Sequence, residues 1–178
     1  PADTTGTSFI NEHHLGMRHA LGLGYSWKYR GWLSFRQGID FTEAWMDRDK
    51  NDQKWVRGYD WSANLNSSFN LYGMRNFANL PIKSLRHVMT PSLGISYQPD
   101  SRRNEDLYYF GGIGVRSGEK AATLNYALEH KWQIKYGEKD KEKRINDLFT
   151  LSSRGSASLY KDDKPLGMIS HNLAFNPG

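Results

Sequence analysis

The chain has 178 residues, a formal net charge of +5 and a mean hydropathy of −0.74, and it combines 38% hydrophobic with 13% aromatic residues. It contains no Cys, which excludes zinc–thiolate sites, disulfide scaffolds and thiol catalysis. No run approaches the roughly 18 consecutive apolar residues that a membrane-spanning helix needs, so a helical membrane protein is excluded as well.

The chain opens at PADTTGTSF, without an initiator Met or a signal segment. Either a signal peptide has been removed or the chain is an internal piece of a longer polypeptide; we expect the second, with an irregular leader at 1–13. The basic residues are scattered and form no block of like charges, which indicates mainly a solvated surface. Nucleic acid is therefore not an expected partner.

Alternation of apolar and polar residues predicts β-strands along most of the chain. From Trp55 to Leu71 the odd positions are mainly apolar or aromatic, while the even positions from Gly58 are polar or glycine. Several predicted strands have about 13 to 18 residues, against the usual five or six of globular sheets. The eight predicted strands span 14–27, 32–45, 55–72, 83–98, 107–115, 120–136, 147–160 and 165–175.

The breaks between these strands tend to alternate in length. KYRG, RSGE and KDDKP are short, whereas MDRDKNDQK, PDSRRNED and GEKDKEKRIND are long and charged; the third break, GMRNFANLPI, is also long. Short turns on one side and long polar loops on the other are typical of outer-membrane barrels. We therefore expect an all-β, antiparallel, up-and-down transmembrane β-barrel segment over 1–178, with no second domain.

Aromatic residues supply a length check on this prediction. Trp32 and Trp45 lie 13 residues apart, which for a tilted strand corresponds to roughly 33 Å along the membrane normal. An apolar band of about 25 Å with an aromatic girdle at each edge needs about that separation. The predicted girdle residues are Trp27, Trp32, Trp45, Trp55 and Trp132.

The side chains at the polar positions of the same strands would line a hydrated lumen. These side chains either solvate the barrel interior or guide a phosphorylated sugar head group, because Arg and Lys pair with phosphate and Asn contacts sugar hydroxyls. The candidates are Arg36, Asp40, Asp60, Asn64, Asn66, Asn70, Arg86, Asn125, Glu129 and Lys131.

The segment LRHVMTPSLGISYQPD at 85–100 carries a proline in the middle of a predicted strand. A mid-strand proline removes a ladder hydrogen bond, which costs several kcal/mol in lipid unless a bulge or a lumen water satisfies the orphaned carbonyl. This segment, together with FNLYGM upstream, resembles the carboxy-terminal barrel of LptD (OstA-like) lipopolysaccharide-assembly proteins, especially the branch from Bacteroidetes and Chlorobi-type bacteria. The matching motif positions are Arg86, His87, Pro91, Ser92, Tyr97, Pro99 and Asp100, with Tyr72 and Gly73 upstream.

The resemblance implies a translocon of the bacterial outer membrane that inserts lipopolysaccharide into the outer leaflet through a polar lumen and a lateral opening. It implies outer-membrane lipids, an LptE-like lipoprotein plug and periplasmic bridge proteins as partners. The chain departs from the family in showing no periplasmic jelly-roll domain, too few strands for so large a barrel, and an ending in LAFNPG. These departures favour a sector of a larger barrel.

The sequence gives little support for a phosphate-binding loop, a metal site or a catalytic site. GGIGVRSGEK fails the phosphate-loop spacing because Glu119 follows Gly118. His13, His14 and His19 lack an acidic pair at ligand spacing, so no metal and no cofactor is expected. His87 and His130 lie near Ser84 and Glu129, but the sequence does not bring a nucleophile and a base together, and we expect no enzyme activity.

Two alternatives remain open. The first is a small, complete eight-stranded outer-membrane barrel that acts as an adhesin or anchor. The second is a soluble barrel that binds a lipid and turns its apolar parity inward.

Overall fold

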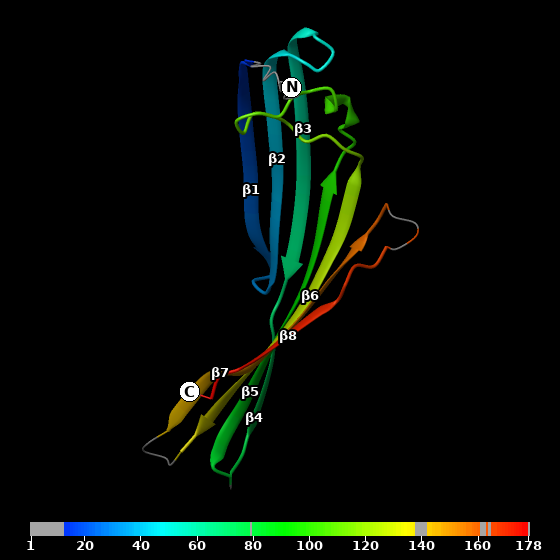
Figure 1. Ribbon diagram of the computed structural model, residues 1–178. Coiled ribbons are helices and arrows are strands. Elements are labelled where there is room, and N and C mark those ends of the chain that lie inside the picture. Colours follow the sequence, from blue (N-terminus) through cyan, green and yellow to red (C-terminus); the bar gives the residue numbers. More distant parts are fainter. Residues whose placement is uncertain (1–12, 79, 138–141, 161–162, 164, 178) are drawn as a thin grey trace, which may run out of the picture. The chain divides into compact units, whose positions relative to one another are not determined.

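The computed structural model describes residues 13–78, 80–137, 142–160, 163 and 165–177 (Figure 1). The described chain forms eight strands and one short 3-10 helix, η1 (Arg102–Asn104). No helix in it is long and apolar enough to cross a membrane. The strands are β1 (Gly16–Tyr29), β2 (Leu33–Arg48), β3 (Lys54–Ser68), β4 (Leu71–Asn76), β5 (Ile82–Gln98), β6 (Ala121–Tyr136), β7 (Lys143–Ser158) and β8 (Ser170–Phe175).

The strands form one sheet in the order β1-β2-β3-β5-β6-β7-β8, with β4 also paired to β5. Strands that follow one another in the chain are neighbours, except that β3 and β4 pair one after the other with β5. The topology is therefore an up-and-down meander, and the predicted all-β antiparallel fold is confirmed. Among the described strands β1 and β8 do not pair with each other, so the sheet is open. An open sheet is compatible with a sector of a larger barrel.

The chain divides into two compact units. Unit 1 consists of Pro1–Leu21, as far as it is described, with Phe41–Asp60 and Ser101–Gly118. Unit 2 consists of Gly22–Asp40, Trp61–Asp100 and Glu119–Gly178.

In unit 2 the register separates two faces of the sheet. Odd residues of β5 pair with even residues of β6 and then with odd residues of β7, as in the row Leu93, Tyr126, Gly155. The apolar face contains Leu65, Leu85, Met89, Leu93, Ile95, Leu124, Leu128, Trp132, Ile134, Leu151 and Leu173. The polar face contains Asn64, Asn66, Arg86, Thr90, Ser96, Thr123, Asn125, Glu129, Lys131, Lys135, Ser152, Ser156 and Asn172.

Pro91 explains why β3 and β4 are separate strands. Ser68 pairs with Ser92 and Leu71 pairs with Met89, so β3 and β4 follow β5 in one unchanged register and are interrupted only at 69–70. The N–H of Phe69 donates to the carbonyl of Pro91 at 3.3 Å, but proline has no N–H to return that bond. Pro91 itself pairs with Leu128 without a register shift, so it lies in no bulge.

Register shifts occur elsewhere in unit 2. One lies between Ile82 and Ser84 in β5, and another lies between Trp132 and Ile134 in β6. Opposite the second shift, Asp147 of β7 has a φ of +55°, the left-handed conformation that bulges favour. Both irregularities lie close to strand ends, where a bulge bends the strand without breaking the central ladder.

Several predicted boundaries need correction. The predicted strand at 107–115 is wrong: it is irregular, with one bridge between Phe110 and Ile113. Gly111, Gly112 and Gly114 have φ between +54° and +157°, which turns the chain where the alternation suggested a strand. The eighth strand is instead β4, which overlaps the end of the predicted third strand and the beginning of the predicted third break.

The predicted long break after the second strand is a short loop at 49–53, and β7 begins at Lys143, before the predicted 147. Apart from His13, the predicted leader at 1–13 lies outside the described residues. Parts of GEKDKEKRIND and KDDKP lie outside them as well.

Unit 1 holds a small core beneath the segment 101–118. Ala44 and Met46 of β2 are 0% and 1% exposed, and Ser101 and Asn104 are buried with them. A Cβ on Gly58 would meet Leu107 Cδ1 at 2.1 Å, because the segment lies directly on that residue. Figure 1 shows the segment, in yellow-green, crossing the strands of this unit.

Asp47 of β2 binds the start of the chain segment that leads into β1. Its Oδ1 accepts a hydrogen bond from the N–H of Leu15 at 3.1 Å, with Arg48 Nε 3.4 Å and His14 Nδ1 3.7 Å from the carboxylate. Burial raises the pKa of Asp47, but the Leu15 hydrogen bond, Arg48 and His14 together hold that pKa below its usual value. Asp47 lies past Trp45, outside the membrane span predicted from the tryptophans.

Candidate functional site

The polar face of unit 2 is built from continuous cross-strand rows. Asn66 faces Gly94, which faces Asn125, which faces Ser156. A second row begins with a hydrogen bond from Thr90 Oγ1 to Asn70 Oδ1 at 2.8 Å, and Glu129 lies on the other side of Thr90. The rows bring predicted lumen residues from two separate parts of the sequence, 66–70 and 125–129, together.

Glycines let the polar side chains lie flat on this face. A Cβ on Gly38 would come within 2.9 Å of Asn64 Nδ2, and one on Gly94 within 2.3 Å of Asn66 Oδ1. A Cβ on Gly22 would come within 3.1 Å of Asp40 Oδ1. Each amide or carboxylate therefore occupies the space of a missing side chain and leaves the surface above it open.

A basic pocket of about 590 Å³ lies where β5, β6 and β7 adjoin on the polar face. Arg86, Lys135 and Arg144 contribute three cationic groups to its wall. Arg86 is held over the Tyr72 ring with its Cζ 5.2 Å from the centroid, and Lys135 forms an ion pair with Glu142. Guanidinium and ammonium groups gathered in one concavity suit a phosphorylated ligand.

Sequence reasoning missed two of these three cations. Lys135 shares its parity with the predicted Lys131, so the alternation could have included it. Arg144 falls in a predicted loop, and only the register Lys135 to Arg144 places it on this face. Lys131 is ion-paired with Glu129 on its own strand, at 3.0 Å.

The other predicted lumen residues have different surroundings. Arg36 lines a second polar hollow of about 610 Å³ with Asn66, Ser68 and Ser92. Asp60 belongs to unit 1, where Arg116 Nη1 lies 3.5 Å from its Oδ1. Asp60 therefore contacts the segment 101–118 that covers its strand.

Side-chain hydrogen bonds hold that segment in place. Asn104 Nδ2 donates to the carbonyls of Tyr59, at 3.0 Å, and Arg116, at 2.8 Å. Arg116 Nη1 donates to Ser101 Oγ at 2.8 Å. The segment is thus joined both to itself and to the edge of β3.

The apolar face differs from the surface of an ordinary soluble domain. Among the described residues only Ala44, Met46 and Ala122 form buried hydrophobic core, while large apolar side chains are exposed along most strands. Leu23, Tyr25, Leu93 and Ile95 are each more than 40% exposed. Apolar surface on this scale requires an apolar partner or lipid.

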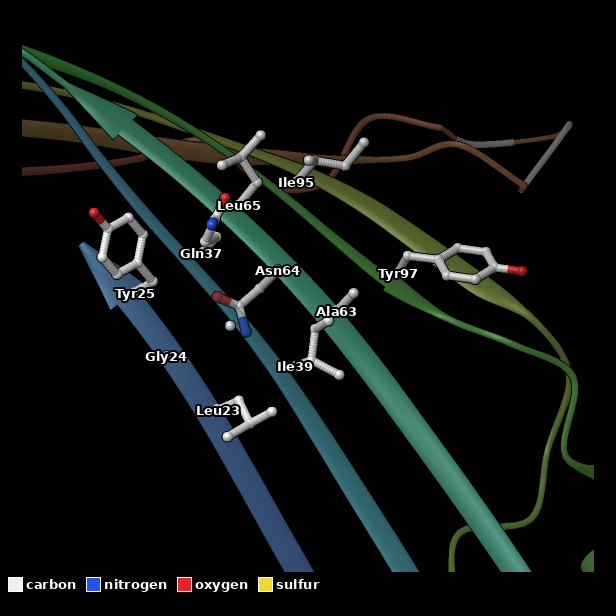
Figure 2. A pocket seen from close by; sticks show the side chains of 11 residues that line it. Leu23, Gly24, Tyr25, Gln37, Ile39, Ala63, Asn64, Leu65, Ile95 and Tyr97 are labelled. Atoms are coloured by element: carbon white, nitrogen blue, oxygen red, sulfur yellow. The ribbon is translucent and has the colours of Figure 1, made fainter. Parts of the chain in front are cut away.

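A hollow of about 560 Å³ crosses the apolar face between β1 and β5. Figure 2 shows Leu23 and Tyr25 of β1, Ile39 of β2, Ala63 of β3 and Tyr97 of β5 around it. Small residues at its floor, including Gly24 and Gly38, leave room between the larger side chains.

The predicted girdle residues make varied contacts. Trp27 stacks on Phe35 with centroids 4.5 Å apart, and Trp32 meets the edge of Phe69 at 5.4 Å. Trp55 is 74% exposed. Trp45 lies beneath Arg57, and Trp132 stacks on His87 at 4.8 Å.

Two histidine contacts lie on the apolar face. His87 Nε2 and His130 Nδ1 are 3.0 Å apart in a stack that includes Trp132, and His171 Nδ1 lies 2.8 Å from Ser153 Oγ. Within the described ranges no three His, Cys, Asp or Glu residues are placed to hold a metal ion.

The motif positions of 85–100 alternate between the faces. Arg86 and Ser92 belong to the polar face, whereas His87, Pro91 and Tyr97 belong to the apolar face. Pro99 and Asp100 directly follow β5. The motif therefore includes a basic-pocket residue, the point of interruption between β3 and β4, and the end of the central strand.

No curated protein and no solved structure matches this chain. A family model described as "LptD protein" matches residues 2–177, almost the whole length. Proteins of this family act in lipopolysaccharide transport at the bacterial outer membrane and are transport proteins, in agreement with the two-faced antiparallel sheet described above. The chain belongs to the LptD protein family.

Proposed function

We propose that this sheet is one sector of a larger transmembrane barrel whose polar face guides lipopolysaccharide into the outer leaflet. The observation that carries the proposal is the separation of faces: one set of strands bears a basic, amide-lined surface and, on the opposite side, an exposed apolar one. In a membrane barrel these surfaces face lumen and lipid, respectively.

The sheet edges support a larger barrel. Among the described strands β1 and β8 each pair on one side only. Unpaired backbone groups cost several kcal/mol each in hydrocarbon, so further strands must flank both edges in the membrane. The two open edges therefore favour a sector over a complete eight-stranded barrel.

Different polar groups would bind different parts of the head group. Arg86, Lys135 and Arg144 would bind phosphates, and the Asn64 and Asn66 amides would contact sugar hydroxyls. Acyl chains would leave between strands through a lateral opening, with the apolar face already in contact with lipid. An LptE-like lipoprotein in the lumen and periplasmic bridge proteins complete the proposed assembly.

The motif at 85–100 further favours the Bacteroidetes and Chlorobi-type branch of the family. Its residues supply both Arg86 to the basic pocket and Pro91 to the central strand. The sheet performs no covalent chemistry in this proposal.

Neutralising polar-face cations tests the guiding role. We expect the triple variant Arg86→Gln, Lys135→Gln, Arg144→Gln to reduce newly surfaced lipopolysaccharide at least tenfold, because the loss of even one charge-assisted hydrogen bond to phosphate, at about 1.5–3 kcal/mol, corresponds to tenfold or more. The measurement is antibody-labelled lipopolysaccharide on intact cells that express equal amounts of the barrel.

The matched control removes three charges away from the polar face, with Arg75→Gln, Lys120→Gln and Lys143→Gln. Arg75 and Lys143 pair with the apolar-face residues Leu85 and Tyr136, and Lys120 precedes β6. The control should leave surface lipopolysaccharide near wild type. Unchanged lipopolysaccharide in the first variant, or an equal loss in both, would rule out the guiding role.

A further inference from the structure

Two arginines in unit 1 lie against one tyrosine ring. Arg57 Cζ is 5.7 Å from the centroid of Tyr59, and Arg103 Cζ is 3.9 Å from the same centroid. Arg57 lies also over Trp45, at 5.4 Å. We call Trp45, Arg57, Tyr59 and Arg103 the arginine–aromatic cluster.

The cluster is held in place from several sides. Arg103 Nη2 donates to the Tyr59 carbonyl at 3.0 Å, and Asn104 Nδ2 donates to the same oxygen, so η1 is fixed along β3. Arg57 is paired through Nε with Glu43. The Tyr59 ring stacks on Phe41, with centroids 6.3 Å apart.

These contacts position the guanidinium groups but leave them accessible. The Arg57 side chain is 50% exposed although its partner Glu43 is only 17% exposed, and Arg103 is exposed. Stacking on aromatic rings reduces the rotamer entropy that a long cation loses when it binds an anion.

The parity of the cluster places it on the side that carries the apolar residues. Within unit 1, Trp45, Arg57 and Tyr59 share the odd parity of Phe41, whereas the buried Ala44 and Met46 and the covered Gly58 have even parity. The cluster lies within a few residues of the 49–53 loop. Arginine beside tryptophan and tyrosine at the end of a membrane strand is suited to the level of lipid head groups. Anionic phosphate is the head-group chemistry that a guanidinium group binds best.

We propose that the arginine–aromatic cluster is an outward-facing binding site for the phosphate of a membrane lipid head group. The site shares the membrane setting of the proposed function but goes beyond it, since it lies outside the lumen path and requires no transport. It would hold a phosphorylated lipid beside the sheet and fix the depth of these strands in the bilayer.

The test uses the full native polypeptide that contains this chain, purified in detergent and incubated with lipid A that carries two phosphates. Native mass spectrometry counts the lipid retained, with dephosphorylated lipid A as the second probe. We expect the double variant Arg57→Gln, Arg103→Gln to bind the phosphorylated probe about tenfold more weakly than wild type, through the loss of charge-assisted hydrogen bonds. Dephosphorylated lipid A should bind both proteins weakly and equally.

Arg75→Gln is the matched control, because Arg75 also lies over one ring, that of Phe77, but has no second arginine on that ring. It should change retention less than twofold. If the double variant does not show the heat-dependent gel mobility of a folded barrel, Arg103→Gln alone replaces it, because Arg103 lies outside the strands.

Equal retention by wild type and variant would overturn the proposal, as would equal binding of the two probes. Complete competition by excess inorganic phosphate would also overturn it, by showing a site for free anions. None of these results depends on lipopolysaccharide reaching the cell surface, so failure of the lipid site is distinguishable from failure of the proposed function.

Discussion

At the scale of single residues, Pro91 shows how one missing donor changes a strand. The register of β5 is undisturbed on both sides of Pro91, yet its partner strand is interrupted at 69–70 because the Phe69 carbonyl receives no bond from residue 91. No bulge is needed, since the other bond of the pair, from Phe69 N–H to Pro91, is made at 3.3 Å.

Pro91→Ala should therefore join β3 and β4. The variant gains a ladder bond worth about 0.5–1.5 kcal/mol, more in a low-dielectric setting, against about 0.4–1 kcal/mol of chain entropy that proline had removed from the unfolded state. We expect slower hydrogen exchange in 69–71, measured by mass spectrometry on the folded protein. Exchange at wild-type speed or faster would show that the missing donor does not cause the interruption.

Also at this scale, the basic pocket shows what sequence patterns can and cannot predict. The alternation along β6 alone predicts that Glu129 and Lys131 lie on the polar face, because it requires no knowledge of the neighbouring strands. Arg144 joins Lys135 only through the pairing of β6 with β7, whose register shifts at 132–134. A shift of that kind depends on a bulge at Asp147 that no alternation pattern reveals.

At the scale of elements, the long strands were predictable and the segment 101–118 was not. Residues such as Leu107, Tyr109, Ile113 and Val115 alternate as a strand does, but positive φ values at the intervening glycines turn the chain. The segment instead packs Leu107 and Val115 against Gly58. Only the packing of this segment against β3 shows that it is irregular and not a strand.

Gly58→Ala should displace this segment. Its Cβ would meet Leu107 Cδ1 at 2.1 Å and Val115 Cγ2 at 2.8 Å, and Asn104 Oδ1 lies 3.0 Å away. We expect faster cleavage within 101–118 by trypsin, at Arg102, Arg103 or Arg116, with the strands left intact. Gly73→Ala is the control, since its nearest neighbour would be 4.0 Å from the added Cβ. Cleavage at equal rates in the two variants would show that the segment does not depend on close packing at Gly58.

At the scale of the whole molecule, the two faces of one sheet point to a membrane barrel that carries an amphiphile. The exposed apolar residues, the basic and amide-lined polar residues, and the family to which the chain belongs all agree with such a barrel. The proposed sector of a larger barrel would supply the strands that the two unpaired edges of the described sheet need in lipid.

The most direct test of this central claim is the intact mass of the native polypeptide extracted from outer membranes and recognised by its tryptic peptide HVMTPSLGISYQPDSR. We predict a mass several times the 20.5 kDa of this chain, because we propose that the sheet is one sector of a large barrel. A mass close to 20.5 kDa would mean that these strands form the whole protein, and it would contradict both the sector and the proposed route for lipopolysaccharide.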